Sequence, residues 1–477
     1  MPGRVRKGLV LSLRSAMLLV LLSGMWSGWR VNRANDQRRA VAAIRRAGGG
    51  ISYSYPFLVW KGYRNPNARP WAPAWLRNWL GDEFFQEVIS VQFFNRPLTD
   101  HDLAPLASLD CLEELAISGA PITDGGLKYI ANLKELRTLH LWETPGITDA
   151  GIAHLSSLTK LQTLALYRCS ITDASLVHLR TMDNLEMLDL AETGVMGPGL
   201  SHLDRMAKLK RLFTPTNRAG LTHIGRLHGL QELYAYDTRK PIPGDPLTDL
   251  TDLAGLKSLR VLVLGDNLCS DTGLATLSGL SGLTRLGIGG ERVTDAGLNH
   301  IAKLKRLFTP TNRAGLAHIG RLYGLQELYA YDTRMPTPCD GLTDLAGLKG
   351  LRVLILGDNL CSDTGLATLS GLSGLTQLGI GGERVTDAGL SHLAKLKGLQ
   401  ELTVYKSRVT GAGLAVLLDL PNLTSLDLQD SARVGDSGVE PLKKLTGLRT
   451  LGLVGTTVNE AGMTVIRQAL PTARVVR

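Results

Sequence analysis

The sequence predicts an α/β solenoid that is right-handed and horseshoe-shaped, with a parallel sheet on its concave face and helices on its convex face. Three observations predict this fold. The 477 residues include 53 glycines without proline-rich low complexity, which indicates many repeated turns. A unit of about 24 residues recurs from Val88 onward. Each unit joins leucines two apart, as on a strand, to leucines three apart, as on a helix.

Near the N-terminus lies an apolar segment, Ser15–Trp29, between two groups of arginines. This arrangement predicts a single-pass membrane anchor within residues 1–30, with Trp26 and Trp29 at the interface. The segment is shorter than the roughly 20 residues that cross a bilayer, unless it starts at Leu9 and tolerates Arg14. A cleaved secretory signal is the alternative, although no A-x-A site follows. Positive charge on both flanks leaves open which side of the membrane the repeats face.

Residues 31–87 are predicted to contain a juxtamembrane helix and a Trp-rich N-terminal cap. The stretch Asp36–Arg46 has helical apolar spacing and stops at three glycines. Its arginines face either lipid head groups or solvent, and the spacing does not decide which. Four of the seven tryptophans follow, at Trp60, Trp71, Trp75 and Trp79. We expect this region to seal the first repeat, because solenoid ends need covering; a collar lying on the membrane is the alternative.

The repeat domain is predicted to cover residues 88–470, followed by a tail at 471–477. Its unit reads L-x-x-L-x-L, a variable stretch, [IV]-T-D-x-G-L and then x-x-L-x-x-L. One complete unit runs from Leu136 to Leu158. The same form recurs at Leu112–Leu133, Leu161–Leu179, Leu185–Leu203, Leu259–Leu280, Leu283–Leu304, Leu423–Leu445 and Leu448–Ile466. Neither strand nor helix buries its apolar side alone, so stacked units share one continuous core.

The Thr-Asp pair of the unit is predicted to cap each helix, because a short side-chain oxygen accepts hydrogen bonds from the free N–H groups of a first turn. We therefore expect structural roles for the aspartates of this motif, which are Asp124, Asp149, Asp173, Asp295, Asp387 and Asp436. Repetition also accounts for the histidines that recur at one helix position, which are His154, His178, His202, His300 and His392.

The units resemble leucine-rich repeats of the cysteine-containing type, as found in F-box leucine-rich-repeat proteins. Cys169 in CSITDASL stands at the cysteine place of that type. The wider layout, an apolar segment, RRAVAAIRRAGG and T-D-A-G-L repeats, is similar to membrane-anchored planctomycete repeat proteins. The resemblance implies a protein-binding scaffold, since such repeats serve many partners. The first alternative is an SCF-type ubiquitin-ligase adaptor, although no recognisable F-box precedes the repeats. The second alternative is a carbohydrate binder.

A long block of the repeat domain is duplicated. Residues 209–303 recur as 304–395, and Leu253–Lys303 differs from Leu345–Lys395 at five positions. Such near identity indicates a recent tandem duplication, and an adjustable array suits a scaffold better than a unique active site. Each copy carries a Pro-containing insertion directly after a strand, Thr238–Pro246 or Thr333–Gly341. These insertions are predicted to be loops on one rim of the solenoid.

The net charge of +10 belongs to the N-terminal part. Residues 1–80 contain 14 Lys and Arg against the single acid Asp36, whereas the remainder is nearly neutral. A groove for phosphate backbones needs Lys and Arg massed on the folded domain. The sequence therefore predicts no nucleic-acid partner.

The five cysteines form no C-x-x-C pair and no metal-ligand spacing with histidine, so neither a disulfide framework nor a metal site is expected. They are Cys111, Cys169, Cys269, Cys339 and Cys361. Because Cys269 and Cys361 occupy equivalent places in the two copies of the duplicated block, we interpret them as small apolar fillers.

Side chains that flank the inward-facing leucines of each strand point to the concave face. Aromatic residues gather there although they make up 5% of the chain, and Tyr and Trp are favoured in interfaces because they bury much area at low rotamer cost. The predicted binding residues are His140, Trp142, Tyr167, Tyr234, Tyr236, Tyr329, Tyr331 and Tyr405. The core of a protein or peptide site is expected beside the Pro-containing loops, at Tyr234, Tyr236, Tyr329 and Tyr331. The alternative is that the rings pack only against neighbouring repeats, above all Phe213 and Phe308.

No sequence feature predicts catalysis. Gly287, Gly289 and Gly290 lie in a repeat strand, whereas a phosphate-cradling loop needs a strand-to-helix turn of defined spacing. The chain contains no G-x-S-x-G, H-E-x-x-H or P-loop motif. We therefore expect a membrane-tethered scaffold for a protein or peptide, not an enzyme, with no cofactor and no metal. The identity of the partner and the oligomeric state stay open.

Overall fold

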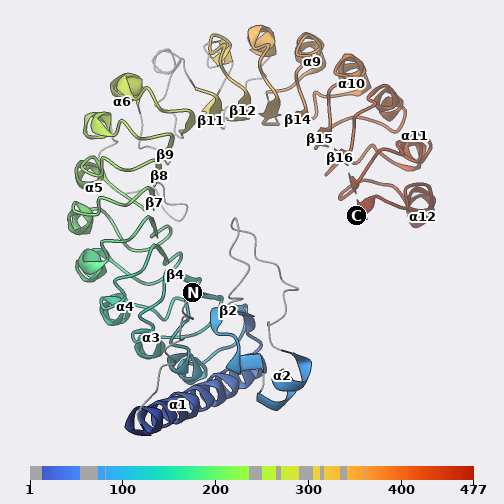
Figure 1. Cartoon of the computed structure of the whole chain (residues 1–477). Coiled ribbons are helices and arrows are strands. Elements are labelled where there is room, and N and C mark those ends of the chain that lie inside the picture. The colour runs from blue at the N-terminus through green and yellow to red at the C-terminus, as the bar shows by residue number, and fades with distance from the viewer. Residues whose placement is uncertain are drawn as a thin grey trace, which may run out of the picture. The chain divides into compact units, whose positions relative to one another are not determined.

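The computed structural model describes residues 13–53, 73–80, 82–235, 250–264, 270–288, 304–311, 316–317, 319–332, 341–358 and 360–477. The chain divides into two compact units, Met1–Val195 (unit 1) and Met196–Arg477 (unit 2). Each unit repeats a strand, a turn and a short helix, with the strands side by side in one layer and the helices in another (Figure 1).

The described part of unit 1 begins with a long helix and continues with five parallel strands. Its helices are α1 (Leu13–Arg46), α2 (Ala74–Leu80), η1 (Asp82–Phe84), η2 (Asp100–Ser108), α3 (Asp124–Ile130), α4 (Asp149–Leu155) and η3 (Asp173–Thr181), where η denotes a 3₁₀ helix. Its strands are β1 (Gly50–Tyr53), β2 (Val88–Phe94), β3 (Glu114–Ser118), β4 (Thr138–Trp142), β5 (Thr163–Ala165) and β6 (Met187–Asp189). Strands β2 to β6 pair in chain order and in parallel, whereas β1 pairs antiparallel with β2.

Unit 2 continues the same alternation. Its described helices are η4 (Pro198–Leu203), α5 (Arg218–Ile224), η5 (Thr251–Gly255), α6 (Asp271–Thr276), η6 (Leu277–Gly279), η8 (Gly341–Gly347), α9 (Asp363–Leu369), α10 (Asp387–Ser391), η9 (His392–Lys395), η10 (Gly413–Asp419), η11 (Asp436–Gly438), α11 (Val439–Leu442) and α12 (Glu460–Ala469). Its described strands are β7 (Arg211–Phe213), β8 (Glu232–Ala235), β9 (Val261–Leu264), β10 (Arg285–Gly287), β11 (Arg306–Thr311), β12 (Glu327–Asp332), β13 (Val353–Leu356), β14 (Gln377–Gly381), β15 (Glu401–Tyr405), β16 (Ser425–Asp427), β17 (Thr450–Gly452) and β18 (Arg474–Val476). From β7 to β18, neighbours in this order pair in parallel.

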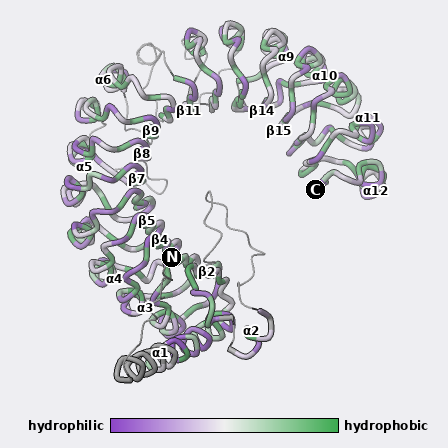
Figure 2. Tube along the Cα trace, viewed as in Figure 1, coloured by the Kyte–Doolittle hydropathy of each residue, from purple (hydrophilic) through white to green (hydrophobic). Residues whose placement is uncertain are grey.

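The leucines of each strand point toward the helices. On β4, Leu139 and Leu141 are fully buried, whereas His140 between them is only partly buried. In-register leucines, such as Leu115, Leu139 and Leu164, form a buried ladder from strand to strand. Figure 2 shows hydrophobic residues recurring on strands and helices alike. Each buried leucine stabilises the fold by about 1.5–3 kcal/mol. We call the sheet face turned away from the helices the inner surface.

The T-D-x-G-L motif links each repeat to the next. Thr148 caps its own helix, because its hydroxyl accepts a hydrogen bond from the Ala150 N–H at 3.4 Å. Asp124, one repeat earlier, accepts from the Thr148 N–H at 2.8 Å and from the Thr148 hydroxyl at 2.6 Å. The same pair of hydrogen bonds joins Asp100 to Thr123, Asp149 to Thr172, Asp363 to Thr386, Asp387 to Thr410 and Asp436 to Asn459.

These bonds confirm the structural role of the motif but correct its geometry. The threonine caps the helix, and the aspartate holds the start of the following repeat. The motif glycine leaves room for this contact, since a Cβ at Gly413 would collide with the Asp387 carboxylate. Asp295 lies outside the described residues. The motif is replaced at Met196-Gly197 and at Asn217-Arg218, next to the boundary between the units.

Helix α1 is one continuous helix of 34 residues, so the predicted anchor and the predicted juxtamembrane helix are joined without a break. Among the described residues, none of the helices combines the length and the apolar character that crossing a membrane requires.

The C-terminal half of α1 seals the first repeat. Ile44 is fully buried, and the Gln37 side chain accepts a hydrogen bond from the Val88 N–H at 3.2 Å. An ion pair of 2.6 Å joins Arg30 to Glu87. Strand β1 adds an antiparallel edge to β2. The edge of the sheet is therefore covered by α1 and β1.

The position of the tryptophans differs from the expectation. Trp75 and Trp79 on α2 are 70% and 77% exposed, so they do not cover the apolar edge of the first repeat. Helix α1 does so instead, because it carries the longer apolar stripe, formed by Ala34, Ala40, Val41 and Ile44. Arg38 on its outer side pairs with Glu83 at 3.4 Å. Trp60 and Trp71 lie outside the described residues.

Candidate functional site

The inner surface of unit 1 carries a stacked pair, His140 and Trp142, both on β4. Their ring centroids lie 4.6 Å apart, with 21° between the planes. The neighbouring strands place Ala116 and Ala165 beside His140, which leaves room for the imidazole. Burial lowers the pKa of His140, and its Nε2 is buried without a hydrogen-bond partner among the described residues. The imidazole is therefore neutral at pH 7.

Tyr167, which follows β5, belongs to a network with three charged residues. Its hydroxyl donates a hydrogen bond to one Glu192 carboxylate oxygen at 2.9 Å, and Arg168 Nε donates to the other at 2.5 Å. Arg168 also pairs with Glu143 at 2.8 Å and lies over the Tyr167 ring, 5.0 Å from its centroid. Of these four residues, only Tyr167 is predicted from the strand pattern; Arg168, Glu143 and Glu192 are not.

The charged residues of this network have left-handed backbones. Glu143, Arg168 and Glu192 have φ values of 53°, 57° and 55°. Other repeats place glycine at this position, as at Gly119 and Gly455, with φ values of 64° and 74°. A side chain in this region costs on the order of 1 kcal/mol. A charged residue where other repeats have glycine is the signal by which the sequence could have revealed the network.

The inner surface of unit 2 carries two Phe–Tyr platforms, one in each copy of the duplicated block. Phe213 on β7 is in register with Tyr234 on β8, and Phe308 on β11 is in register with Tyr329 on β12. The ring centroids lie 4.3 Å apart in the first platform and 4.2 Å in the second, with 7° between the planes in each. All four side chains are half-buried, so the rings pack on the neighbouring strand and still present surface to solvent.

The platform tyrosines keep their hydroxyl protons at neutral pH. Burial raises the pKa of Tyr234 and of Tyr329 above the usual range for tyrosine. The Tyr329 hydroxyl therefore offers a donor at the edge of an apolar ring, whereas the Tyr234 hydroxyl is engaged by a hydrogen bond with the Glu232 side chain. Tyr236 lies outside the described residues, and although β12 includes Tyr331, its side chain is not described. The two Pro-containing insertions lie outside the described residues except for Gly341.

Tyr405 lies across the neighbouring strand β14. Its ring occupies the space beside Gly381, where a Cβ would come within 2.7 Å of two ring carbons. Its hydroxyl donates to the Leu356 carbonyl oxygen at 2.7 Å. Burial, with a further contribution from the charge of Asp358, raises the pKa of Tyr405. The hydroxyl of this predicted site residue is therefore used within the fold.

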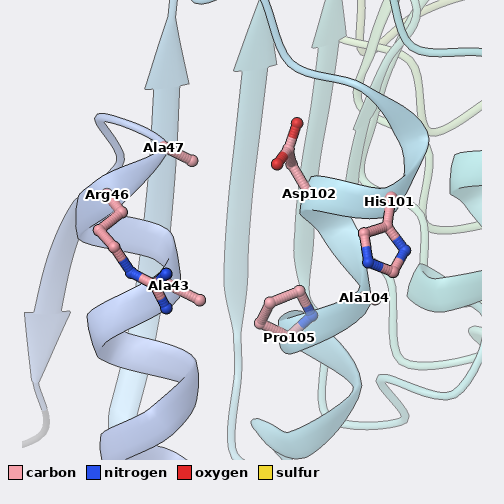
Figure 3. A pocket seen from close by; sticks show the side chains of 7 residues that line it. All are labelled: Ala43, Arg46, Ala47, His101, Asp102, Ala104 and Pro105. Atoms are coloured by element: carbon pink, nitrogen blue, oxygen red, sulfur yellow. The ribbon is translucent and has the colours of Figure 1, made fainter.

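A hollow of about 410 Å³ lies between the end of α1 and η2 (Figure 3). It is lined by Ala43, Arg46, Ala47, His101, Asp102, Ala104 and Pro105. The Asp102 carboxylate accepts two hydrogen bonds from Thr99, and these bonds lower its pKa. Arg46 Nε donates to the Ala42 carbonyl oxygen at 3.3 Å. Asp102 and Arg46 form their hydrogen bonds within their own segments of the chain. We therefore interpret the hollow as a packing gap between α1 and η2, not as a binding site.

The cysteines of the described ranges are free thiols. Burial raises the pKa of Cys169 to about 11 and that of Cys361 to about 12, so both are protonated and unreactive at neutral pH. Both are buried, in agreement with the filler role expected for Cys361. Within these same ranges, no three His, Cys, Asp or Glu side chains gather closely enough to hold a metal ion.

A family model described as Leucine Rich repeat matches residues 110–131 in unit 1 and 419–443 in unit 2. No curated protein matches the chain in sequence. Together with the leucine ladders and the strand–helix alternation, the two matches define a leucine-rich-repeat protein. Its cysteine-containing subtype and its planctomycete-like layout stay predictions.

Three solved structures are similar at low identity. An internalin from Listeria monocytogenes is 18% identical, with 81% of this chain and 86% of that chain covered and a TM-score of 0.39. A leucine-rich-repeat protein from Leptospira interrogans is 18% identical, with 78% and 92% covered and a TM-score of 0.41. The ectodomain of the Arabidopsis thaliana receptor kinase GASSHO1/SCHENGEN3, in complex with CASPARIAN STRIP INTEGRITY FACTOR 2, is 14% identical, with 82% and 58% covered and a TM-score of 0.39.

Proposed function

We propose that this protein is a binding scaffold whose protein or peptide ligand lies on the inner surface of unit 2. The leucine-rich-repeat fold is typical of protein-binding domains. The observation that carries the proposal is the Phe–Tyr platform, which occurs twice with the same geometry. Half-exposed aromatic rings bury much area at low entropic cost when a partner covers them. The protonated Tyr329 hydroxyl adds a directional donor at the edge of the second platform.

Photo-crosslinking tests this proposal. A benzophenone amino acid at position 329 should capture a discrete partner from cells that make the protein. The same benzophenone amino acid in place of Leu418, which is 43% exposed on η10, should not capture this partner. Capture from both positions, or from neither, would contradict a site on the inner surface.

Removal of both platform tyrosines should then weaken binding of the captured partner. Tyr234→Ala combined with Tyr329→Ala should lower affinity at least about tenfold, which corresponds to roughly 1.4 kcal/mol, because aromatic anchors carry much of the energy of an interface. The measurement is isothermal titration of the purified partner. Tyr323→Ala is the matched control, since this residue is 71% exposed and lies outside both platforms. Unchanged affinity in a folded double variant would reject the platforms as the site.

We propose further that the N-terminal end of unit 1 contacts an anionic membrane surface. Trp75 and Trp79 are exposed and four residues apart on α2, so they share one helix face. Met25 and Trp29 are 72% and 54% exposed and equally spaced on α1. Tryptophan favours the interface between lipid and water. The excess of basic over acidic side chains within residues 1–80 favours contact with anionic head groups.

Vesicle sedimentation tests the membrane contact. The full chain should sediment with vesicles of phosphatidylcholine and phosphatidylserine, and much less with phosphatidylcholine alone. Trp75→Ala with Trp79→Ala should reduce the bound fraction on anionic vesicles about tenfold, because two interfacial rings are lost. Phe94→Ala, at a 51% exposed position on β2, serves as control. Equal binding to neutral vesicles, or no effect of the double substitution, would refute this contact.

A further inference from the structure

The two copies of the duplicated block meet at a cluster that occurs once among the residues that the structure describes. Strand β10 ends the described part of the first copy, and β11 and β12 open the second. Their register places Arg285 beside Arg306 and Arg306 beside Glu327, with Phe308 and Tyr329 in the next row on the inner surface. We call these five residues the junction cluster.

The two arginines of the junction cluster differ in their partners. Arg306 forms an ion pair with Glu327 at 2.5 Å. Arg285 has no ion-pair partner among the described residues, and its Nε is buried without a hydrogen bond. The Arg285 guanidinium lies over the Phe308 ring, 5.3 Å from its centroid. The cluster therefore holds one positive charge in excess.

The position of the Arg285 guanidinium depends on Gly287. This glycine faces the inner surface between Val263 and Phe308, and it has no side chain to cover the ring. One face of Phe308 is stacked on Tyr329, and the opposite face is open to the guanidinium. The charge of Arg285 also lowers the pKa of both Tyr234 and Tyr329 against the larger effect of burial, so Arg285 acts on both platforms.

We propose that the junction cluster binds a carboxylate, the acidic side chain of a bound peptide, and thereby selects acidic ligands for the inner surface of unit 2. A planar guanidinium held on an aromatic face binds a carboxylate with two parallel hydrogen bonds. The Tyr329 hydroxyl adds a neutral donor nearby, and Phe308 with Tyr329 packs against the aliphatic part of the ligand. This inference rests on the proposed function, because it names the chemistry of that ligand.

The second copy of the block lacks this cluster. Gln377 stands where the first copy has Arg285, and this is one of the five differences between the near-identical stretches. Gln377 is in register with Glu401, and Gly379 with Thr403, so no aromatic ring follows. The first platform, Phe213 with Tyr234, has no described arginine over its ring. Within the described parts of the two copies, the duplication therefore produces two platforms but a single carboxylate site.

Selection from a phage library of random dodecapeptides tests the proposal. The peptides are fused to the phage at their C-terminus, so any carboxylate comes from a side chain. Against the full chain, selected peptides should be enriched several-fold in Asp and Glu. Against Arg285→Gln the acidic enrichment should vanish while aromatic and apolar enrichment persists. The substitution introduces the residue that the second copy already carries, so folding should be preserved.

Titration of one selected peptide gives the magnitude. Replacing its acidic residue by the isosteric amide should weaken binding to the wild-type chain about tenfold or more, and should not weaken binding to Arg285→Gln. The effect should shrink at high salt. Gln377→Arg is the matched control and should leave the selection unchanged.

The outcomes separate two failures. If the chain selects peptides without acidic preference, or if Arg285→Gln leaves the preference intact, the carboxylate site is wrong and the platforms stand. If no peptide is selected at all, both the carboxylate site and the proposed function are contradicted.

Discussion

Replacing Gly382 by alanine should destabilise unit 2 by about 3 kcal/mol or more, the largest effect expected from a single added methyl group at any glycine that the structure describes. Gly382 follows β14 with a φ of 97°, beyond the range that other residues adopt at low cost. A Cβ there would also collide with the Asp358 carbonyl oxygen of the preceding repeat. Because the obstacle is backbone, it cannot move aside without shifting a strand. Urea denaturation followed by circular dichroism measures the loss.

Gly350 provides the matched control. A Cβ at Gly350 would meet backbone oxygens only at 3.6 and 3.9 Å, which is ordinary contact. The first copy carries Ser258 at the equivalent position, so Gly350→Ser should change stability by less than about 0.5 kcal/mol. A Gly382→Ala protein as stable as this control would mean that the left-handed turn after β14 is not the native conformation.

Replacing Asp387 by alanine should destabilise unit 2 by about 2 kcal/mol. Its carboxylate accepts from the Thr410 N–H and from the Thr410 hydroxyl, both at 2.7 Å, and these bonds hold consecutive repeats together. The variant leaves the partly buried Thr410 N–H without its acceptor. Asp387→Asn keeps one acceptor oxygen without the charge and should lose about half as much. The urea midpoint of the full chain reports both values.

Asp419→Ala controls for the loss of a negative charge. Asp419 ends η10 and is exposed, and its carboxylate has no hydrogen bond or ion pair in the described part of the chain. Its replacement should change stability by less than about 0.5 kcal/mol. If Asp387→Ala is no worse than Asp419→Ala, the bond between repeats is not a source of stability.

The repeat fold follows from local patterns that the sequence displays directly. The spacing of Leu139 and Leu141 predicts a strand, and both residues are buried on the side of the helices. The same alternation predicts that His140, Tyr234 and Tyr329 face the inner surface. Their register and their partial burial agree with this prediction. The face of the sheet to which a side chain points follows from periodicity, because successive side chains on a strand alternate between the two faces.

The contacts between repeats could not be predicted in this way. Helix-capping patterns predict that Asp124 acts on its own helix, yet its partner Thr148 lies 24 residues later. Strand alternation predicts Tyr405 on the inner surface, but the orientation of its ring depends on Gly381 of the preceding repeat. Trp75 and Trp79 suggested a cap, but α1 fills that place from a distant part of the chain. Helix-capping rules and strand periodicity describe a residue's own element, and these contacts join different elements.

The sequence by itself determined that this protein is a stack of strand–helix repeats, and which side chains turn toward the helices or away from them, because both follow from periodicity within a single repeat. Only the tertiary structure decided that Arg285 lies over Phe308, that Phe213 and Phe308 stack on Tyr234 and Tyr329, and that motif aspartates such as Asp124 bind the start of the following repeat. These contacts depend on the register between strands about 24 residues apart, and register is set by packing of the shared core.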